Sequence, residues 1–226
     1  NDTAAAVPRG PLSAARYNGS GVTGNKNYGY VGGSGLVGVS TIDRIDYSND
    51  TATAIAKSYN GIDAGGNKAA TGNASYGYWG GHYPAGSSVS RLDYANDTTA
   101  TVAKGPTVNN ILQLAASGNA QFGYWLGGHP GPYSTVSRVD YSNDTATAAA
   151  KGPLTTAARH LAGNSAAANA LSEGLQGTAS NIGVNRVPVG TDYGYIAGGY
   201  GGSPISTIDR VDYANDTATA LARSPL

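Results

Sequence analysis

Four Arg-x-Asp pairs are the residues of this chain whose types and spacing could do chemistry. The pairs are Arg44 with Asp46, Arg91 with Asp93, Arg138 with Asp140 and Arg210 with Asp212. Residues two apart on a β-strand point to the same face, so each Arg is expected beside its Asp. Such a ring of charges could bind a ligand, or each Arg could bridge bidentately to an Asp of its own repeat or of the next one. Four copies of one pair favour the structural brace, because a catalytic site is asymmetric and single.

The tripeptide Asn-Asp-Thr also recurs, and it has three interpretations. Asn-x-Ser/Thr is the acceptor pattern for N-glycosylation in secreted proteins. The candidate glycosylated residues are Asn18, Asn49, Asn73, Asn96, Asn143 and Asn215. Aspartates near the first tripeptide, Asp43, Asp46 and Asp50, could hold calcium. However, Asp43 becomes Ser90 and Ser137 in the two middle repeats, which removes one oxygen ligand. A turn between two strands explains the recurrence without any ligand.

Residues that differ between repeats are the better candidates for ligand binding, because a repeated scaffold presents its function on variable loops. The repeats diverge after each double glycine. The loops expected there carry His82, Tyr83, His129, Tyr133 and Tyr200. Tyrosine rings on one rim could stack on sugars, which makes a lectin-like, glycan-binding propeller the alternative function. Two histidines without a recurring carboxylate or third histidine do not make a zinc site, so no metal and no cofactor are predicted.

Sequence signatures of enzymes are missing from the chain. It contains no nucleophile elbow, no zinc-protease pattern and no phosphate loop between a strand and a helix. Glu173 is the single glutamate, so a paired-carboxylate mechanism would need two aspartates, and these are expected in turns and braces. The sequence therefore predicts a protein that is not an enzyme, with a propeller hydrolase as the third alternative.

Composition narrows the class of partner. Of the 226 residues, 12% are charged, and the 14 basic and 14 acidic side chains cancel. This balance argues against nucleic acids and anionic membrane surfaces, which both attract basic patches. No apolar run approaches the roughly 20 residues that cross a membrane as a helix. With no cysteine, the chain has no disulfides and no thiolate sites.

An internal repeat places these residues on a common element. Asn49, Asn96, Asn143 and Asn215 recur at steps of 47, 47 and 72 residues, and an aromatic-Gly-Tyr run followed by two glycines precedes each of them. Each unit contains short alternating runs separated by turn residues, which indicates strands. Four strands in each unit predict the blades of one β-propeller domain. The predicted units are residues 12–57, 58–104, 105–151 and 152–226, and an insertion at residues 164–192 holds the only predicted helix.

The order of these runs resembles a known repeat. An aromatic-x-aromatic strand, a double glycine, a strand ending in Asp-Tyr and a Thr-rich strand are similar to the kelch-type propeller repeat over nearly the whole chain. Thr or Ala stands where kelch repeats usually have an outer-strand Trp. This resemblance implies an all-β propeller with four kelch-like, four-stranded blades. The repeated sequence motif DYSNDTATA also resembles tandem-repeat structural proteins of aquatic phages and microbes. This second resemblance implies a surface fibre or virion part without catalytic residues.

We therefore expect a non-enzymatic structural or adhesive module of an extracellular, cell-surface or virion fibre. Residues 1–12 repeat residues 215–226 with eight identities in twelve positions, so they form a fifth copy of a strand that four blades need only four times. The surplus copy could pair on a sheet edge of another molecule, or be the cut end of a longer array. Expected partners are copies of the chain itself and, in the lectin-like alternative, glycans. The ends of the chain are expected to exchange a strand and so close the ring.

Overall fold

The structure is a computed structural model that describes residues 5–17, 19–34, 40–59, 65–165 and 193–226. The described part is all-β and consists of four four-stranded antiparallel sheets, each built from consecutive strands. The predicted four-blade propeller class is confirmed. The predicted helix lies almost entirely within residues 166–192, outside the described residues. In the described part of the chain, no helix has the length and apolarity needed to cross a membrane.

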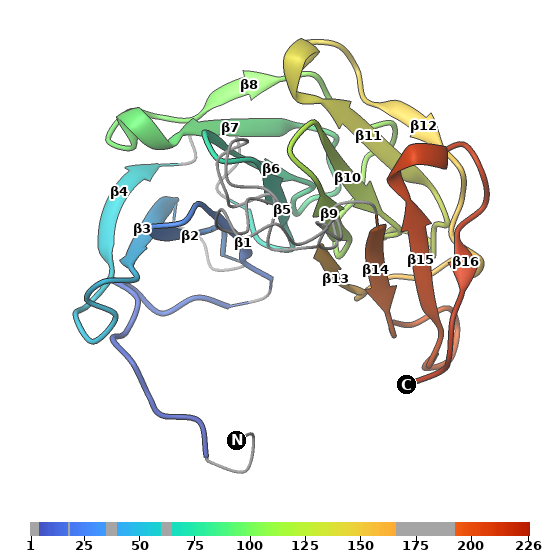
Figure 1. Ribbon diagram of the computed structural model, residues 1–226, viewed down its shortest axis with the longest axis horizontal. Coiled ribbons are helices and arrows are strands. Elements are labelled where there is room, and N and C mark those ends of the chain that lie inside the picture. The colour runs from blue at the N-terminus through green and yellow to red at the C-terminus, as the bar shows by residue number, and fades with distance from the viewer. Residues whose placement is uncertain (1–4, 18, 35–39, 60–64, 166–192) are drawn as a thin grey trace, which may run out of the picture.

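Each blade is a meander that begins at the centre of the molecule and runs outward (Figure 1). Blade 1 contains β1 (Gly21–Gly24), β2 (Tyr28–Gly32), β3 (Thr41–Asp46) and β4 (Ile55–Tyr59). Blade 2 contains β5 (Ala69–Gly72), β6 (Tyr76–Gly80), β7 (Val89–Asp93) and β8 (Val102–Lys104). Blade 3 contains β9 (Ala115–Gly118), β10 (Phe122–Leu126), β11 (Val136–Asp140) and β12 (Ala149–Lys151). Blade 4 contains β13 (Ala162–Ser165), β14 (Tyr193–Ala197), β15 (Ile208–Asp212) and β16 (Leu221–Ala222).

The Asn-Asp-Thr segments form the turns between the third and fourth strands, as the turn interpretation predicted. In blades 2, 3 and 4 the turn begins with a short 3-10 helix, η1 (Tyr94–Asn96), η2 (Tyr141–Asn143) and η4 (Tyr213–Asn215). In blade 2 the predicted Thr-rich strand is limited to Val102–Lys104, because the residues between Asn96 and Val102 belong to the turn and pairing starts only at Val102. In blades 2 to 4 the outer strands have only two or three residues, which leaves little free strand edge for pairing with other chains.

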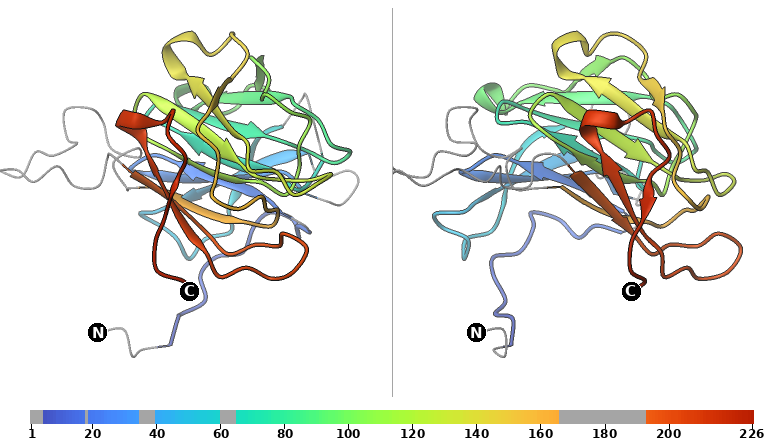
Figure 2. Two further views of the ribbon diagram at one scale, coloured as in Figure 1. Left: turned by 90° about the vertical axis from the view of Figure 1, so that its right-hand side faces the viewer. Right: turned by 45° about the vertical axis from the view of Figure 1, so that its right-hand side comes forward.

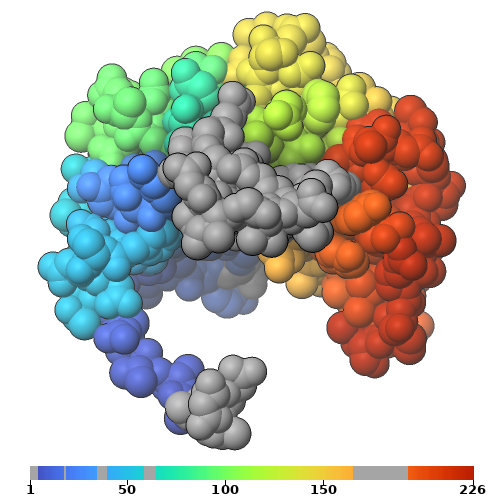
Figure 3. Space-filling model, viewed as in Figure 1, coloured from blue at the N-terminus to red at the C-terminus, as the bar shows by residue number. Residues whose placement is uncertain are grey.

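The four blades form an arc that is open on one side. The inner strands β1, β5, β9 and β13 pack side by side in chain order, whereas β13 does not pack against β1 in the same way. Figures 1 and 3 show the opening between blade 1 and blade 4, and Figure 2 shows the blades from the side. The expected strand exchange between the chain ends is wrong, because each sheet takes its four strands from one continuous stretch.

The core lies between blades, not within them. Trp79 on β6 is fully buried, and its Nε1 donates to the carbonyl oxygen of Gly21 in blade 1 at 3.0 Å. Trp125 on β10 repeats this contact with Ala69 of blade 2 at 3.2 Å. Both rings lie under the glycine that ends the second strand of the preceding blade, Gly32 or Gly80, where a Cβ would come within 3 Å of the indole. Large side chains on one blade thus pack against the backbone of the previous blade.

Candidate functional site

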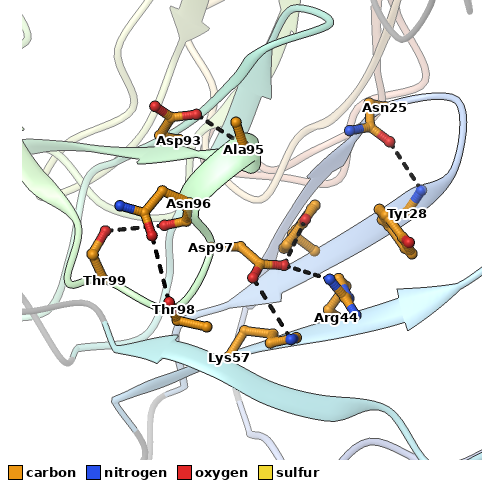
Figure 4. Close-up of polar contacts among 11 residues, drawn as sticks. Asn25, Tyr28, Arg44, Lys57, Asp93, Ala95, Asn96, Asp97, Thr98 and Thr99 are labelled. Carbon is orange, nitrogen blue, oxygen red and sulfur yellow. Dashed lines mark hydrogen bonds and ion pairs between the residues drawn. The ribbon is translucent and has the colours of Figure 1, made fainter.

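Each Arg in blades 1 to 3 reaches to the following blade and not to the Asp two residues away. Arg91 on β7 places Nη1 2.7 Å from Oδ2 of Asp144, the Asp of the Asn-Asp-Thr turn in blade 3. The equivalent ion pairs are Arg44 with Asp97 at 2.8 Å and Arg138 with Asp216 at 2.7 Å. The first of these pairs is drawn in Figure 4. The Arg residues therefore brace neighbouring blades, which is one of the two structural arrangements that the sequence allowed.

The aspartates predicted to pair with Arg serve the turns instead, which corrects the predicted pairing. These residues are Asp46, Asp93, Asp140 and Asp212. Each carboxylate accepts a hydrogen bond from the backbone N–H two residues on, as Asp93 does from Ala95 at 2.9 Å. A short polar side chain at a strand end commonly satisfies the first free N–H of the following turn. Same-face geometry brings Arg and Asp onto one side of the strand, but the turn N–H lies closer to the carboxylate.

A Tyr and a Lys complete each brace, and neither was identified from the sequence. Asp144 accepts hydrogen bonds from the Tyr78 hydroxyl at 2.8 Å and from the Lys104 ammonium at 2.9 Å, in addition to Arg91. The other complete braces are Tyr30, Arg44 and Lys57 on Asp97, and Tyr124, Arg138 and Lys151 on Asp216. One buried carboxylate thus receives three donors from the preceding blade, and two of the donors are cations.

The electrostatics of the brace keep all its members in their bonding forms. Burial opposes ionisation of Asp144, but hydrogen bonds from Lys104 and Tyr78 and the positive charges outweigh it and lower the pKa of the carboxyl below its ordinary value. Burial, and then the bond to the Asp144 carboxylate, raises the pKa of the Tyr78 phenol above its ordinary value. The carboxylate therefore stays ionised as an acceptor while the phenol stays protonated as a donor.

Aromatic rings hold the brace from two sides. The Arg91 guanidinium lies over the Tyr76 ring, 4.3 Å from its centroid, and Tyr78 stacks on Tyr141 of blade 3 at 4.9 Å between centroids. In blade 3, Phe122 replaces the first Tyr and Arg138 still lies 4.3 Å over the ring. The ring face, not the hydroxyl, therefore carries this contact.

A Gly-Pro clasp after the fourth strand also joins consecutive blades. Gly105 donates its N–H to the carbonyl oxygen of Asp144, and the Pro106 carbonyl accepts from the Ala148 N–H, both at 2.8 Å. A Cβ on Gly105 would lie 1.7 Å from the Ala146 carbonyl oxygen, so only glycine permits this approach.

The other two junctions differ in how they make the clasp. Gly152 and Pro153 repeat it on the turn of blade 4. At the junction of blades 1 and 2, Ser58 stands at the Gly position, and its hydroxyl donates to the Thr99 carbonyl. The pairing of β3 with β4 shifts register there, which makes room for the side chain.

The candidate glycosylation residues fall into two environments. Asn49, Asn96, Asn143 and Asn215 are all exposed in the turns. Asn73 is half-buried in the turn between β5 and β6, where its side-chain oxygen accepts from the N–H groups of Ser75 and Tyr76. Asn18 lies outside the described residues. The calcium candidates point to three separate places: Asp43 is buried against Ser13 and Arg16, Asp46 caps its own turn, and Asp50 pairs with Arg9. No metal-binding group of three acidic or histidine side chains occurs within the described ranges.

The predicted rim loops lie at one end of the propeller, but their tyrosines do not form one aromatic surface. Tyr133 is half-buried and packs against the core that Trp125 helps to form, whereas Tyr83 is 68% exposed on blade 2. His129 and Tyr200 are joined by Arg159, a residue that sequence reasoning missed. Arg159 donates to His129 Nδ1 at 2.8 Å and lies 5.2 Å over the Tyr200 ring. Since Arg can only donate, His129 accepts at Nδ1.

A pocket at the same end gathers residues that the sequence reasoning did not single out. Its volume is about 330 Å³. It is lined by Gly19, Asn67, Lys68, Gln113, Leu114, His160 and Leu161. Asn67, Gln113 and His160 each stand two residues before an inner strand and have φ values of 62°, 58° and 56°, a region that L-residues rarely adopt. Backbone bonds link the three, from Gln113 N to Asn67 O and from His160 N to Gln113 O.

These three side chains differ in type at one repeated position, as expected where a repeated scaffold presents its function on variable residues. Their positive φ values are a second feature that is common at functional sites. The signal in the sequence was the register: a variable residue two positions before each Ala-rich or Gly-rich inner strand. No protein-family model matches this chain, and a search of the curated proteins found no match. The site is therefore interpreted from its own chemistry.

Proposed function

We propose that this chain is a non-enzymatic structural module of an extracellular, cell-surface or virion fibre, and that copies of the chain join to build it. One observation carries the proposal: at each of the three junctions the same recurring Tyr, Arg and Lys bind an Asp of the next blade. Asp144, with Tyr78, Arg91 and Lys104, exemplifies this use. A protein that repeats its strongest polar cluster as a joint is suited to holding shape, and the same joint suits addition of further blades.

We propose further that the blades are of the kelch type. The order of the aromatic strand, the double glycine and the strand ending in Asp-Tyr supports this assignment. In blade 2 this order runs from Tyr76 through Gly81 to Tyr94.

The experiment that tests the structural function is sedimentation of the purified chain over a wide concentration range, together with electron microscopy. We expect mass to rise with concentration without any added ligand. Arg91→Ala should lower stability by about 3 kcal/mol, because it leaves the buried carboxylate with less compensation. The same substitution should leave any ligand affinity unchanged. A chain that remains monomeric at every concentration would contradict the proposal.

Glycan binding is the second candidate, favoured by one local arrangement. Arg159 holds His129 and Tyr200 together directly beside the pocket residue His160. An exposed ring with polar donors next to a pocket can take a sugar, whose faces are apolar and whose edges carry hydroxyls. A glycan array decides between the candidates: binding that Tyr200→Ala abolishes, with unchanged melting, would favour the lectin-like function, and Tyr83→Ala is the matched control.

A further inference from the structure

Blade 4 presents three brace donors at the open side of the arc. Tyr195, Arg210 and Arg223 occupy the positions that Tyr124, Arg138 and Lys151 hold in blade 3. Arg210 already lies 4.1 Å over the Tyr193 ring, as the other brace arginines do over theirs. Among the described residues no carboxylate pairs with Arg210 or Arg223, and Tyr195 is 46% exposed whereas its three equivalents are fully buried.

Blade 1 presents the complementary half at the opposite edge of the opening. Asp50 occupies the position of the three acceptor aspartates, yet its side chain is 44% exposed. Tyr47 is the equivalent of the tyrosines on which a preceding blade stacks, and it is 54% exposed. Two positive charges and a phenol on blade 4 thus match one carboxylate and one free ring on blade 1.

The N-terminal arm (residues 7–12) binds the turn between β3 and β4 of blade 1 in the same way that the Gly-Pro clasp binds the turn of the next blade at an interior junction. Gly10 donates to the Asp50 carbonyl oxygen and the Pro11 carbonyl accepts from Ala54, both at 2.8 Å. Gly152 and Pro153 make the same two bonds to blade 4. Arg9 takes the place of the brace lysine, since it pairs with Asp50 at 3.3 Å. The arm has no equivalent of Tyr124 or Arg138.

The arm and the C-terminal residues of blade 4 have equivalent sequences. The arm reads Arg9-Gly-Pro-Leu12, and blade 4 ends in Arg223-Ser-Pro-Leu226. Ser224 stands where Gly10 stands. Ser58 demonstrates that a Ser there can bond the carbonyl of the turn that it meets when the outer strand shifts register, so Ser224 needs a comparable shift of β16 on docking. The Ser224 hydroxyl is therefore suited to donate a hydrogen bond to the Ala52 carbonyl oxygen of blade 1 in another copy.

We propose that blade 4 of one copy docks on blade 1 of a second copy through a fourth brace, in which Asp50 receives Tyr195, Arg210 and Arg223 while the N-terminal arm leaves its position. This proposal rests on the proposed function and names the surfaces that carry it. Tyr47 of the second copy stacks on Tyr195, as Tyr213 does on Tyr124 within the chain.

The occupant is a second copy because the three interior braces hold consecutive blades in one arrangement, and the arc they build leaves blades 4 and 1 of the same chain apart (Figures 1 and 3). The contact joins two different surfaces, so successive additions produce a closed ring of copies or a filament.

Single cysteines test the contact directly, because the chain has none of its own. One sample carries Ser224→Cys, another carries Ala52→Cys, and the two are mixed with a short bis-maleimide at a concentration where sedimentation detects assembly. We expect a covalent dimer in the mixture and none in either sample alone. As the matched control, Ser58→Cys with Thr99→Cys in one chain should link internally, because these are the equivalent positions at the junction of blades 1 and 2.

Other outcomes of this experiment are distinguishable. Assembly without a cross-linked dimer in the mixture overturns the docking surfaces and leaves the proposed function standing. Internal linkage alone in a chain that carries both Ser224→Cys and Ala52→Cys also overturns the proposal, because it means closure within one molecule. A chain that never assembles contradicts the proposed function together with the inference.

Two substitutions separate the brace from the arm. Asp50→Asn should weaken self-association at least about tenfold by removing the shared charge, while Asp46→Asn in the same turn should not. Gly10→Val should strengthen association, because a Cβ there would lie 1.8 Å from the Ala52 carbonyl oxygen and so prevents the arm from binding. Ala6→Val is its control. Weaker association of Gly10→Val would overturn the displacement of the arm.

Discussion

The junctions inside the arc and the two edges at its opening use the same residue types in different surroundings. Asp144 at an interior junction has 8% of its side chain exposed and accepts from three donors, whereas Asp50 at the edge has 44% exposed and one cation beside it. Tyr78 is fully buried, and its counterpart Tyr195 is 46% exposed. The residue type therefore does not determine what a brace member contributes. The adjoining blade does, because it removes water and supplies the partner.

Because the two kinds of brace differ in burial, they should contribute unequally to the free energy of unfolding. An ion pair on the surface contributes little, since water screens both charges and the side chains lose freedom when they pair. A buried carboxylate left without its cations, or buried cations left without their carboxylate, cost several kcal/mol. Matched substitutions at an interior junction and at an edge should consequently have unequal effects on the free energy of unfolding.

The largest effect is expected from removing an interior acceptor. Asp144→Ala should lower the free energy of unfolding by about 3 kcal/mol, because Arg91 and Lys104 stay largely buried without a counter-charge. Asp50→Ala at the edge should remain close to the unsubstituted chain. Urea unfolding monitored by tryptophan fluorescence measures both. Equal losses in the two variants would mean that the blade interface does not govern the strength of the brace.

A substitution in the clasp should have the next largest effect. Gly152→Val brings a Cβ to a place 1.7 Å from the Ala218 carbonyl oxygen, so blades 3 and 4 must separate or shift. Overpacking of this kind costs about 1–3 kcal/mol. Ser224→Val, at the equivalent position of blade 4, should leave the unfolding midpoint of the dilute chain unchanged. If the Ser224 variant lost as much stability, blade 4 would already be in contact with another blade.

The fold and the structural role of the brace Arg could be predicted from the sequence, for a physical reason. A repeat of Asn49, Asn96 and Asn143 at equal steps requires equal units, and alternation within each unit requires strands. The Arg was recognised as structural because it recurs. A bridge to the next repeat was among the predicted arrangements, but the wrong Asp residues were assigned to the brace. Strand periodicity reveals same-strand neighbours such as Asp93, whereas the contact between Arg91 and Asp144 depends on how two sheets are staggered.

The pocket could not be predicted from the sequence, for a different physical reason. Asn67, Gln113 and His160 share a backbone conformation and not a residue type, and their φ values cannot be read from composition or alternation. Lys104, by contrast, recurs with the same 47-residue step as Arg91, and Tyr78 recurs at steps of 48 and 46 residues. Both could have been found by asking which polar residues the repeats share. A comparison of equivalent positions, and not only of identical residues, would have located the pocket residues as well as the brace residues.

A smaller effect is expected from the phenol of the brace. Tyr78→Phe removes one donor to the Asp144 carboxylate and keeps the stacking on Tyr141, so the loss should be about 1.5 kcal/mol, as for a hydrogen bond to a charged group. Tyr195→Phe should change nothing in the dilute chain. Thermal melts of the two variants at one low concentration provide the measurement. A loss in Tyr195→Phe that grows with concentration would instead support docking between copies.

The smallest effect is a dependence of stability on acid. The Asp144 and Asp216 carboxyls have their pKa lowered, since hydrogen bonds and positive charges outweigh burial. In the unfolded chain an Asp titrates near pH 3.9, so between that pH and the lower folded pKa the unfolded chain binds more protons. The stabilisation is therefore present in full above about pH 4 and is lost as pH falls through the folded pKa. Urea unfolding at a series of pH values should give a free energy that declines below about pH 4, with a shallower decline in Asp144→Asn. An unchanged slope in that variant would show that the charge of the brace is not what couples the blades to pH.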